Sequence, residues 1–150
     1  MLIIYWLAVV FHLSLAGEVK PMPSMDPATR LFIKEREGLE AYVVLQRRTW
    51  YDAVQHCKQY NLRLPYIFSF IPIPVIRDKI KQLTGKMPDP NGVLWLNSKF
   101  TDGSGCFTVW LMAPTPASLF FRKCNQTTDK DKYGKVLLGY LCVRDHYSEA

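Results

Sequence analysis

Cysteines are the side chains of this 150-residue chain with the most evident covalent chemistry, and there are four of them. They are Cys57, Cys106, Cys124 and Cys142. An even number of cysteines in an exported chain favours disulfide bonds, whereas the cytosol keeps thiols reduced. Four cysteines allow three pairings, and their positions alone do not select one of them.

A secretory signal peptide is predicted for residues 1–16. The run is apolar and uncharged, and it ends in Ser14-Leu15-Ala16, with small residues three and one positions before a cleavage site. An uncleaved signal anchor is the competing interpretation, but a spanning helix needs roughly 18 to 20 apolar residues and this run is shorter. We therefore expect a secreted, extracellular protein with two disulfide bonds.

His56 stands beside Cys57 and raises the possibility of a thiol nucleophile with a neighbouring base. Adjacent helix positions do not face each other, so the pair is poorly arranged for the hydrogen bond that this mechanism needs. His12 lies in the predicted signal and His146 in the polar tail, so the histidines form no zinc-binding spacing. We expect no catalytic residue, no enzyme, and a surface position for His56.

The element that must position Cys57 is a helix predicted from Thr49 to Tyr60. Thr49 and Asp52 give it a start signal, and Asn61 can end it in the left-handed conformation. The apolar side chains recur at helical spacing on one face: Trp50, Ala53, Val54, Cys57 and Tyr60. Cys57 is therefore expected to face the core.

The other expected elements place helices early and strands late. Residues 17–38 are interpreted as a flexible or loosely docked N-terminal arm, 39–146 as one domain, and 147–150 as a tail. A second helix is predicted over 74–85, with Ile76, Ile80 and Leu83 on one face. Strands are predicted at 39–45, 62–68, 93–96, 107–111, 119–121 and 136–143. This order predicts an α+β fold in which a bridge from Cys57 to Cys142 would tie the first helix to the last strand.

Residues 42–143 resemble a C-type lectin-like domain. Trp50, Ala53 and Cys57 match the pattern W-x-x-A-x-x-x-C, and Leu64-Pro-Tyr-Ile67 matches the L-x-x-I that follows it. Weaker matches follow in the family's order: Trp95-Leu-Asn-Ser98, Phe107-Thr-Val-Trp110 and Tyr140-Leu-Cys142-Val. The resemblance implies two helices, short and mainly antiparallel strands, a long-loop region and a bridge between Cys57 and Cys142. A second bridge from Cys106 to Cys124 would depart from the family's usual pair.

The resemblance also raises the question of calcium. Sugar-binding members hold the ion with a Glu-Pro-Asn or Gln-Pro-Asp triplet and a Trp-Asn-Asp triplet, because calcium takes about 6 to 8 oxygen ligands. Here Pro114 and Pro116 have no acid or amide beside them, and Asp129 and Asp131 alternate with lysines. We expect no calcium cofactor at the usual sugar site. Asp102, Asp129 and Asp131 are weak metal candidates, each more simply interpreted as a turn residue.

The function predicted without calcium is recognition of an extracellular protein or glycan by the loops between residues 97 and 135. The ligand-binding candidates are Phe100, Asp102, Phe120, Phe121 and Tyr133. Phe120 and Phe121 are consecutive in a predicted strand and must face opposite sides, so at least one is expected in the core. The net charge of +6 is scattered, without the basic and aromatic run of a nucleic-acid site.

Two alternatives and one modification complete the expectations. The chain could be a calcium-dependent lectin with atypical ligands, or a membrane-active, toxin-like protein that uses the apolar segment 66–76. That segment is more simply a buried strand that leads into the second helix. Asn125-Gln126-Thr127 is a glycosylation sequon, and a glycan on Asn125 would place that end of the loop in solvent.

Overall fold

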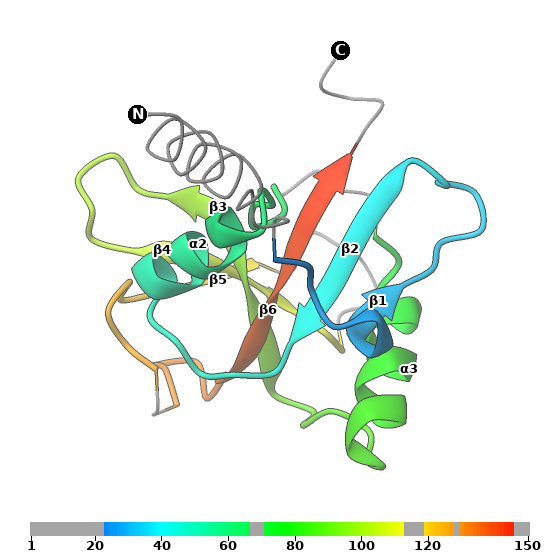
Figure 1. Cartoon of the computed structure of the whole chain (residues 1–150). Helices are drawn as coiled ribbons and strands as arrows, with labels where there is room; N and C mark the ends of the chain where they lie inside the picture. Colours follow the sequence, from blue (N-terminus) through cyan, green and yellow to red (C-terminus); the bar gives the residue numbers. More distant parts are fainter. Residues whose placement is uncertain (1–22, 67–70, 113–118, 128–129, 146–150) are drawn as a thin grey trace, which may run out of the picture.

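A six-stranded sheet forms the centre of the protein, whose computed structural model describes residues 23–66, 71–112, 119–127 and 130–145. The strand order is β1-β2-β6-β3-β4-β5, and only the β3–β6 pair is parallel among these strands. Figure 1 shows this sheet with its two α-helices, so the predicted α+β class and the mainly antiparallel sheet are confirmed. The elements are η1 (Pro27–Thr29), β1 (Arg30–Leu31), β2 (Leu39–Val44), α2 (Trp50–Gln59), α3 (Ile73–Thr84), β3 (Gly92–Lys99), β4 (Cys106–Trp110), β5 (Leu119–Arg122) and β6 (Val136–Asp145).

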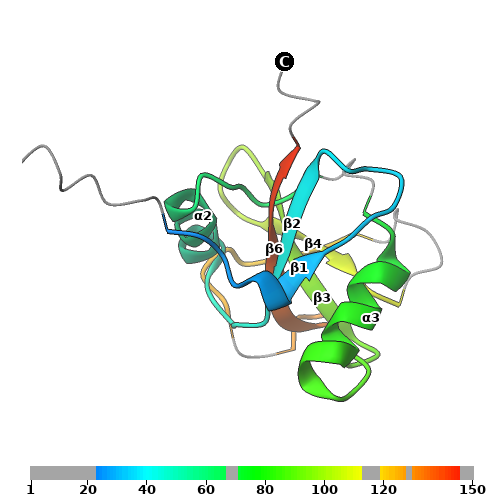
Figure 2. The same ribbon diagram turned by 45° about the vertical axis from the view of Figure 1, so that its right-hand side comes forward.

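The sheet is covered on both faces. Along β2, Tyr42 and Val44 pack in a core cluster with α2, while Ala41 and Val43 pack in a second cluster with α3. Figure 2 shows the strands lying between the two helices. A strand that is buried on both faces needs apolar residues at successive positions, which explains why residues 39–45 alternate only in part.

Helix α2 begins and ends as the sequence predicts. The Thr49 hydroxyl accepts a hydrogen bond from the Asp52 backbone N–H at 3.1 Å. Asn61, just beyond the helix, has a φ of 57°. Trp50, Ala53 and Cys57 are all buried, so the predicted apolar face is confirmed.

Helix α3 is also present, with Gly85 at its end in the left-handed conformation (φ 75°). Ile76 and Ile80 are each 3% exposed and pack against the sheet. Leu83 is 36% exposed, contrary to the expectation that it continues the buried face. The reason is that the whole last turn, residues 81–84, is exposed.

The strand predicted at 62–68 is wrong for the residues that the structure describes. Arg63 alone forms a β-bridge, in which its N–H and C=O pair with those of Val143 at 3.0 and 2.7 Å. Strand β3 pairs with β6 only as far as Tyr140. Beyond that point the edge of β6 that faces away from β2 is open, and Arg63 pairs there with Val143. Tyr66 is 50% exposed, and Phe68 lies outside the described residues.

The stretch interpreted as an N-terminal arm contains the edge strand β1. Arg30 and Leu31 pair with Tyr42 and Ala41 of β2, and Leu31 is only 2% exposed. The expectation of a loosely docked arm therefore does not hold for residues 30–31. Residues 1–22, which include the predicted signal peptide, lie outside the described part of the chain.

The two bridges join distant parts of the fold. Cys57 of α2 is bonded to Cys142 of β6, with Cα atoms 5.2 Å apart, as the resemblance implies. Cys106, the first residue of β4, is bonded to Cys124, two residues after β5, with Cα atoms 5.1 Å apart. All four cysteines are thus used, and the thiol-nucleophile interpretation of Cys57 is excluded because its sulfur is in a bridge.

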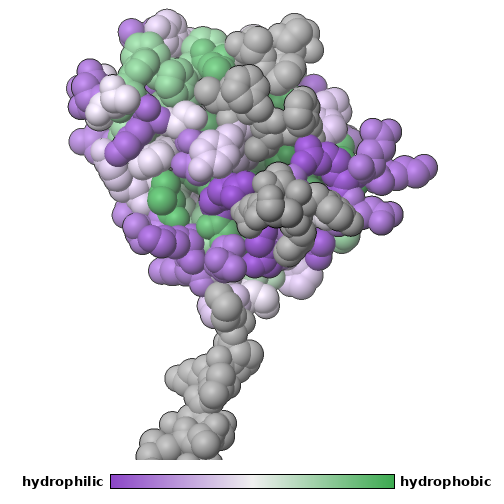
Figure 3. Space-filling view, turned by 90° about the horizontal axis from the view of Figure 1, so that it is seen from above, coloured by the Kyte–Doolittle hydropathy of each residue, from purple (hydrophilic) through white to green (hydrophobic). Residues whose placement is uncertain are grey.

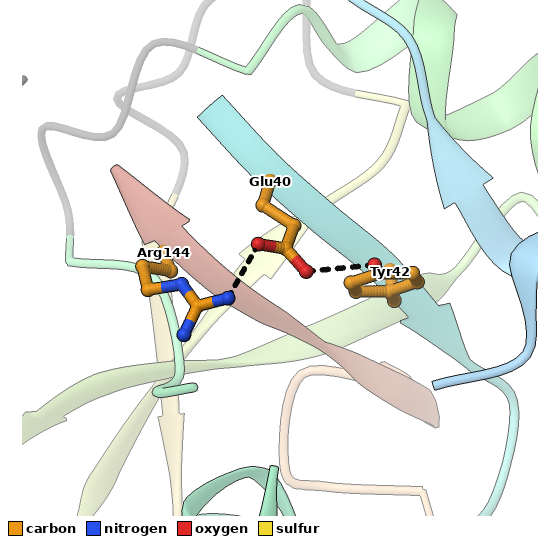
Figure 4. A network of polar contacts seen from close by, with 3 residues as sticks. All are labelled: Glu40, Tyr42 and Arg144. Atoms are coloured by element: carbon orange, nitrogen blue, oxygen red, sulfur yellow. Dashed lines mark hydrogen bonds and ion pairs between the residues drawn. The ribbon is translucent and has the colours of Figure 1, made fainter. Parts of the chain in front are cut away.

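A side-chain network also fixes β2 against β6 (Figure 4). Glu40 lies opposite Arg144 in the strand register, and its carboxylate accepts a hydrogen bond from the Arg144 Nη2 at 2.7 Å. The other carboxylate oxygen accepts a hydrogen bond from the Tyr42 hydroxyl at 2.8 Å. Burial raises the pKa of Tyr42, and the bond to Glu40 raises it further. An opposite-charge pair directly across two strands favours this register over its neighbours.

Candidate functional site

Six aromatic side chains gather where the sheet ends at β4 and β5, and we call them the aromatic edge cluster. They are Phe100, Phe107, Trp110, Phe120, Phe121 and Tyr133. The strand register places Phe107 opposite Phe121 and Thr108 opposite Phe120. Side chains opposite each other point to the same face of a sheet, so the register divides the cluster between the two faces.

The first face carries three phenyl rings. The Phe100 ring centre lies 5.1 Å from that of Phe107 and 5.3 Å from that of Phe121. Gly105 packs against the rings of Phe100 and Phe121, because an added Cβ at that position would lie 3.0 Å from Phe100 and 3.1 Å from Phe121. Phe100 is 37% exposed, so this face presents an aromatic edge to solvent.

The second face carries Trp110 and Phe120 with a lysine laid over them. The two ring centres lie 6.2 Å apart, and the Lys135 Nζ lies 3.7 Å from the Trp110 ring centre and 4.9 Å from that of Phe120. Lys135 is only 8% exposed, and the cation over the rings contributes a favourable electrostatic contact there. Phe120 packs against the α2-side core, so the expectation that one of the two phenylalanines reaches the core is confirmed.

Tyr133 joins the two faces around the edge strand β5. Its ring centre lies 5.3 Å from Phe120 and 6.2 Å from Phe121, which point to opposite sides of β5. Tyr133 itself is 47% exposed. The cluster is therefore continuous around the open edge of the sheet.

A tight turn holds Tyr133 and Lys135 in place. The Asp131 Oδ1 accepts hydrogen bonds from the backbone N–H groups of Tyr133 at 2.8 Å and Lys135 at 2.9 Å. The Asp131 N–H donates to the Lys135 carbonyl at 3.1 Å, and Gly134 takes a φ of 74° that few other residues adopt. Asp131 acts here as a turn residue, as the sequence predicts.

A hollow of about 340 Å³ opens beside Phe121. It is lined by Ser104, Phe121, Arg122, Lys123, Gln126, Lys130, Asp131 and Lys132. The Lys132 Nζ lies 4.6 Å from the Phe121 ring centre and 5.0 Å from that of Tyr133. Among its described lining residues the hollow thus combines an aromatic wall with four basic residues and one acid.

The predicted metal candidates are not gathered into a site in the described residues. The Asp102 Oδ1 accepts a hydrogen bond from the Ser104 N–H at 2.9 Å, and bonding to Ser104 lowers the pKa of Asp102. Asp129 lies outside the described residues, as do Pro114 and Pro116 of the expected calcium loop. Across residues 23–66, 71–112, 119–127 and 130–145, no group of three His, Cys, Asp or Glu side chains could hold a metal ion.

His56 is not the plain surface residue that the sequence suggests. Its Nδ1 lies 2.6 Å from the hydroxyl of Tyr140, which also accepts a hydrogen bond from Arg48. Burial lowers the pKa of His56, and the nearby charge of Arg48 lowers it further. Burial raises the pKa of Tyr140, while its bond to Arg48 opposes that shift. This network joins α2 to the sheet, because His56 lies on α2 and Tyr140 on β6.

Two further sequence candidates are located by the structure. Asn125 is exposed, in the turn that follows Cys124. Of the apolar segment 66–76, Ile71 and Ile76 are buried in the α3-side core, while residues 67–70 lie outside the described part.

None of the described helices is long and apolar enough to cross a membrane. On the face seen in Figure 3, hydrophobic residues form small areas among hydrophilic ones.

The sequence identified Phe100, Phe120, Phe121 and Tyr133, and the structure brings all of these into one cluster. It missed Phe107, Trp110, Lys132 and Lys135. The register of β4 and β5 is the information that was lacking, since it places Phe107 beside Phe121. Asp102 lies in an exposed turn and shares no ring contact or hydrogen bond with the cluster among the interactions described.

Comparison with solved structures finds similar chains, and botrocetin is one of them. The crystal structure of botrocetin, a C-type lectin-like protein of snake venom, aligns with a TM-score of 0.46 and 17% sequence identity. The alignment covers 81% of this chain and 99% of botrocetin. No protein-family model matches the sequence, and no curated protein matches it either.

Proposed function

We propose that the chain is a secreted, non-enzymatic recognition protein of the C-type lectin-like kind. It binds an extracellular protein or glycan through the aromatic edge cluster, without the usual calcium-dependent sugar site. The observation that carries this proposal is the half-exposed Tyr133, which continues the aromatic surface around the open edge of the sheet. Aromatic side chains supply most of the binding energy in many recognition surfaces, because they bury large areas at a small cost in conformational entropy.

The C-type lectin-like assignment is supported by the first helix and by its bridge. Trp50, Ala53 and Cys57 match the family's pattern, and all three are buried on the face that meets the sheet. The bridge from Cys57 to Cys142 joins the first helix of the domain to its last strand, as the pattern requires. The bridge from Cys106 to Cys124 departs from the family's usual second pair and lies next to the proposed binding surface.

The rigid support of the surface favours binding over mere exposure. The Cys106–Cys124 bridge ties the chain after β5 to β4, and the Asp131 turn fixes the segment that carries Tyr133. A surface that is held in place before binding loses less entropy when a ligand docks. Phe100 and Tyr133 are the exposed contact residues, while Phe120 and Trp110 anchor the surface to the core.

Secretion is supported by two features of different kinds. The apolar run at residues 1–16 is typical of a signal peptide, and two disulfide bonds are typical of an oxidising compartment. In that compartment the exposed Asn125 meets the glycosylation machinery as part of Asn125-Gln126-Thr127. Mass analysis of the secreted protein before and after glycosidase treatment checks both features, since the mature N-terminus and the attached glycan are read from the same spectra.

One observation favours a calcium-dependent lectin as the second candidate function. The Asp131 Oδ2 is buried and accepts no hydrogen bond from the residues that the structure describes, and a carboxylate oxygen is the kind of ligand that calcium prefers. The thermal midpoint in several millimolar calcium and in chelator separates the two candidates. A bound ion at about ten times its Kd stabilises the fold by roughly 1.4 kcal/mol, a shift of a few degrees. The proposed function predicts equal midpoints, and a shift that Asp131→Asn abolishes would establish the calcium lectin instead.

The ligand itself is sought with protein and glycan arrays probed in chelator. The wild type is compared with Phe100→Ala and Tyr133→Ala, because both side chains are partly exposed and their removal leaves the core intact. Tyr51→Ala is the matched control, since Tyr51 is 46% exposed and lies on α2. A ligand that is lost with Phe100 or Tyr133 but kept with the control supports the proposal.

A further inference from the structure

We propose that the hollow beside Phe121 binds a sulfated glycan chain, with lysines on the sulfate groups and aromatic rings on the sugar. This inference rests on the proposed function and names the class of its ligand. The residues that line the hollow come from three segments: the turn before β4, strand β5 with the residues after it, and residues 130–132. The charge and the chemistry of these side chains carry the argument.

The charge of the hollow is strongly positive. Among the described residues that line it are Lys123, Lys130, Lys132 and the buried Arg122, together with the acid Asp131. One oxygen of Asp131 already accepts two backbone N–H groups, so part of its charge is compensated within the turn. A concave site lined by one sign of charge concentrates the field and attracts oppositely charged ligands. The hollow therefore favours an anion.

The arrangement of the cations indicates several anionic groups rather than one. Lys123, Lys130 and Lys132 are all exposed, and they lie on two different segments around the hollow. Arg122 is buried, with its guanidinium carbon 5.9 Å from the Trp95 ring centre, so the exposed cations are the three lysines. An ammonium group on a flexible stem acts as a point charge that pairs with sulfate or phosphate. Separate lysines thus match the repeated sulfates of a glycan chain.

The aromatic wall favours a sugar as the carrier of these anionic groups. Phe121 lines the hollow, and the ring centre of Tyr133 lies 6.2 Å from the ring centre of Phe121. Binding pockets combine an apolar wall with a few polar groups that orient the ligand, and volumes of roughly 300 Å³ and more hold small ligands. At about 340 Å³ the hollow has room for a short part of a chain that continues into solvent on either side.

A second basic region tests whether charge alone would suffice. Helix α3 and the turn after it carry Lys79, Lys81 and Lys86, at the opposite edge of the sheet from β5. These three lysines carry the same formal charge as Lys123, Lys130 and Lys132. They do not line the hollow beside Phe121, and they lie apart from the aromatic edge cluster. They provide a matched control for the effect of net charge.

The test uses a size-defined heparin oligosaccharide as the probe, with a chemically desulfated sample of the same chain as the control ligand. Binding to the secreted wild type is compared with the triple variants Lys123→Ala/Lys130→Ala/Lys132→Ala and Lys79→Ala/Lys81→Ala/Lys86→Ala. A lysine beside an anionic surface contributes about fivefold in affinity, so the first variant should bind about 100-fold more weakly. The second variant should bind within about threefold of the wild type, because its lysines act only through long-range charge that salt screens.

Tyr133→Ala separates the aromatic contribution from charge, because it changes no formal charge. It should weaken heparin binding several-fold, whereas desulfated chain should bind to none of the proteins. Thermal midpoints of all variants check that the fold is kept. Equal losses in both triple variants would overturn the inference, and so would tighter binding to a sulfotyrosine peptide than to the heparin oligosaccharide.

Failure of this inference and failure of the proposed function give different results. A ligand from the arrays that needs Tyr133 but not the three lysines would overturn the sulfated-glycan assignment and leave the recognition surface standing. An array ligand that binds equally to the wild type, Phe100→Ala and Tyr133→Ala would overturn the recognition surface itself. Heparin binding that depends on the lysines together with Tyr133 supports both.

Discussion

The two faces of the sheet are held together by different means. The α2 face contains all four cysteines, and both bridges are buried in its core. Two tryptophans on this face donate their indole N–H groups to backbone carbonyls, Trp50 to Leu96 at 2.8 Å and Trp95 to Arg48 at 3.0 Å. The α3 face is packed with aliphatic side chains such as Ile76, Ile80 and Leu94. Cross-links and directional bonds therefore hold one face, and apolar burial holds the other.

This difference explains where the candidate binding surface lies. Phe120 and Trp110 of the aromatic edge cluster pack against the cross-linked α2-side core. The Cys106–Cys124 bridge joins β4 to the segment after β5, directly beneath the cluster. The part of the surface formed by Trp110 and Phe120 is thus attached to the face that covalent bonds restrain.

Removal of the bridges should have the largest effect on stability. The Cys57–Cys142 bridge closes a separation of 85 residues and the Cys106–Cys124 bridge one of 18. Chain entropy then predicts losses of about 4 to 5 kcal/mol for Cys57→Ala/Cys142→Ala and about 3 kcal/mol for Cys106→Ala/Cys124→Ala. Urea unfolding of the two double variants measures both values, and a larger loss from the shorter loop would contradict the account.

Ile80→Ala should be the next largest change, because it opens a cavity on the face that lacks cross-links. Ile80 is 3% exposed, and substitutions of this kind cost about 2 to 5 kcal/mol. Leu83→Ala on the same helix is the control, with an expected loss below about 1 kcal/mol at a position that is 36% exposed. Similar losses for both variants, measured by denaturant unfolding, would show that apolar burial under α3 contributes little.

The ends of the two helices should contribute smaller and nearly equal amounts. Thr49→Ala removes the hydroxyl that accepts the Asp52 N–H and should cost about 1 kcal/mol, while Thr49→Ser keeps it. Gly85→Ala forces a side chain into φ 75° and should also cost about 1 kcal/mol. Nothing lies within 4 Å of the added Cβ, so this second cost is purely conformational, and Gly85→Asn should recover part of it. Thermal midpoints of the four variants check these values.

The smallest predicted effect is a pH dependence under α2. Burial and the charge of Arg48 hold the pKa of His56 below its usual value of 6.5 in the folded state. The unfolded chain therefore binds a proton more readily, and the contribution of His56 to stability is lost as the pH falls below about 6.5. His56→Gln removes this proton and should flatten the dependence between about pH 5 and pH 8. An unchanged slope in urea titrations would show that groups other than His56 dominate this range.

Local signals were sufficient to predict α2, whereas its bridge to Cys142 was implied by the resemblance to a C-type lectin-like domain. The spacing of Trp50, Ala53 and Cys57 fixes a helix face, and the Thr49 cap fixes its start, so both follow from neighbouring residues. The same reasoning failed for residues 62–66, where alternation suggested a strand. Pairing there depends on where β3 leaves β6, which is a long-range property that no local pattern contains.

The candidate site was predictable in four of its six aromatic residues but not in its arrangement. Phe100, Phe120, Phe121 and Tyr133 stand out in the sequence as aromatic residues in a loop-rich region. Their assembly depends on the β4–β5 register and on the Asp131 turn, which carries Tyr133 around the sheet edge. The burial of Lys135 over Trp110 was equally beyond the sequence, because a lone lysine is normally exposed.

The most direct test of the central claim is the affinity of an array-identified ligand for the wild type and for Phe100→Ala/Tyr133→Ala, measured in chelator and in calcium. The account predicts equal wild-type affinity in both solutions. It also predicts a loss of about tenfold or more in the double variant, as expected for aromatic residues at the centre of an interface. Binding that requires calcium, or binding that survives the loss of both aromatic side chains, would contradict it.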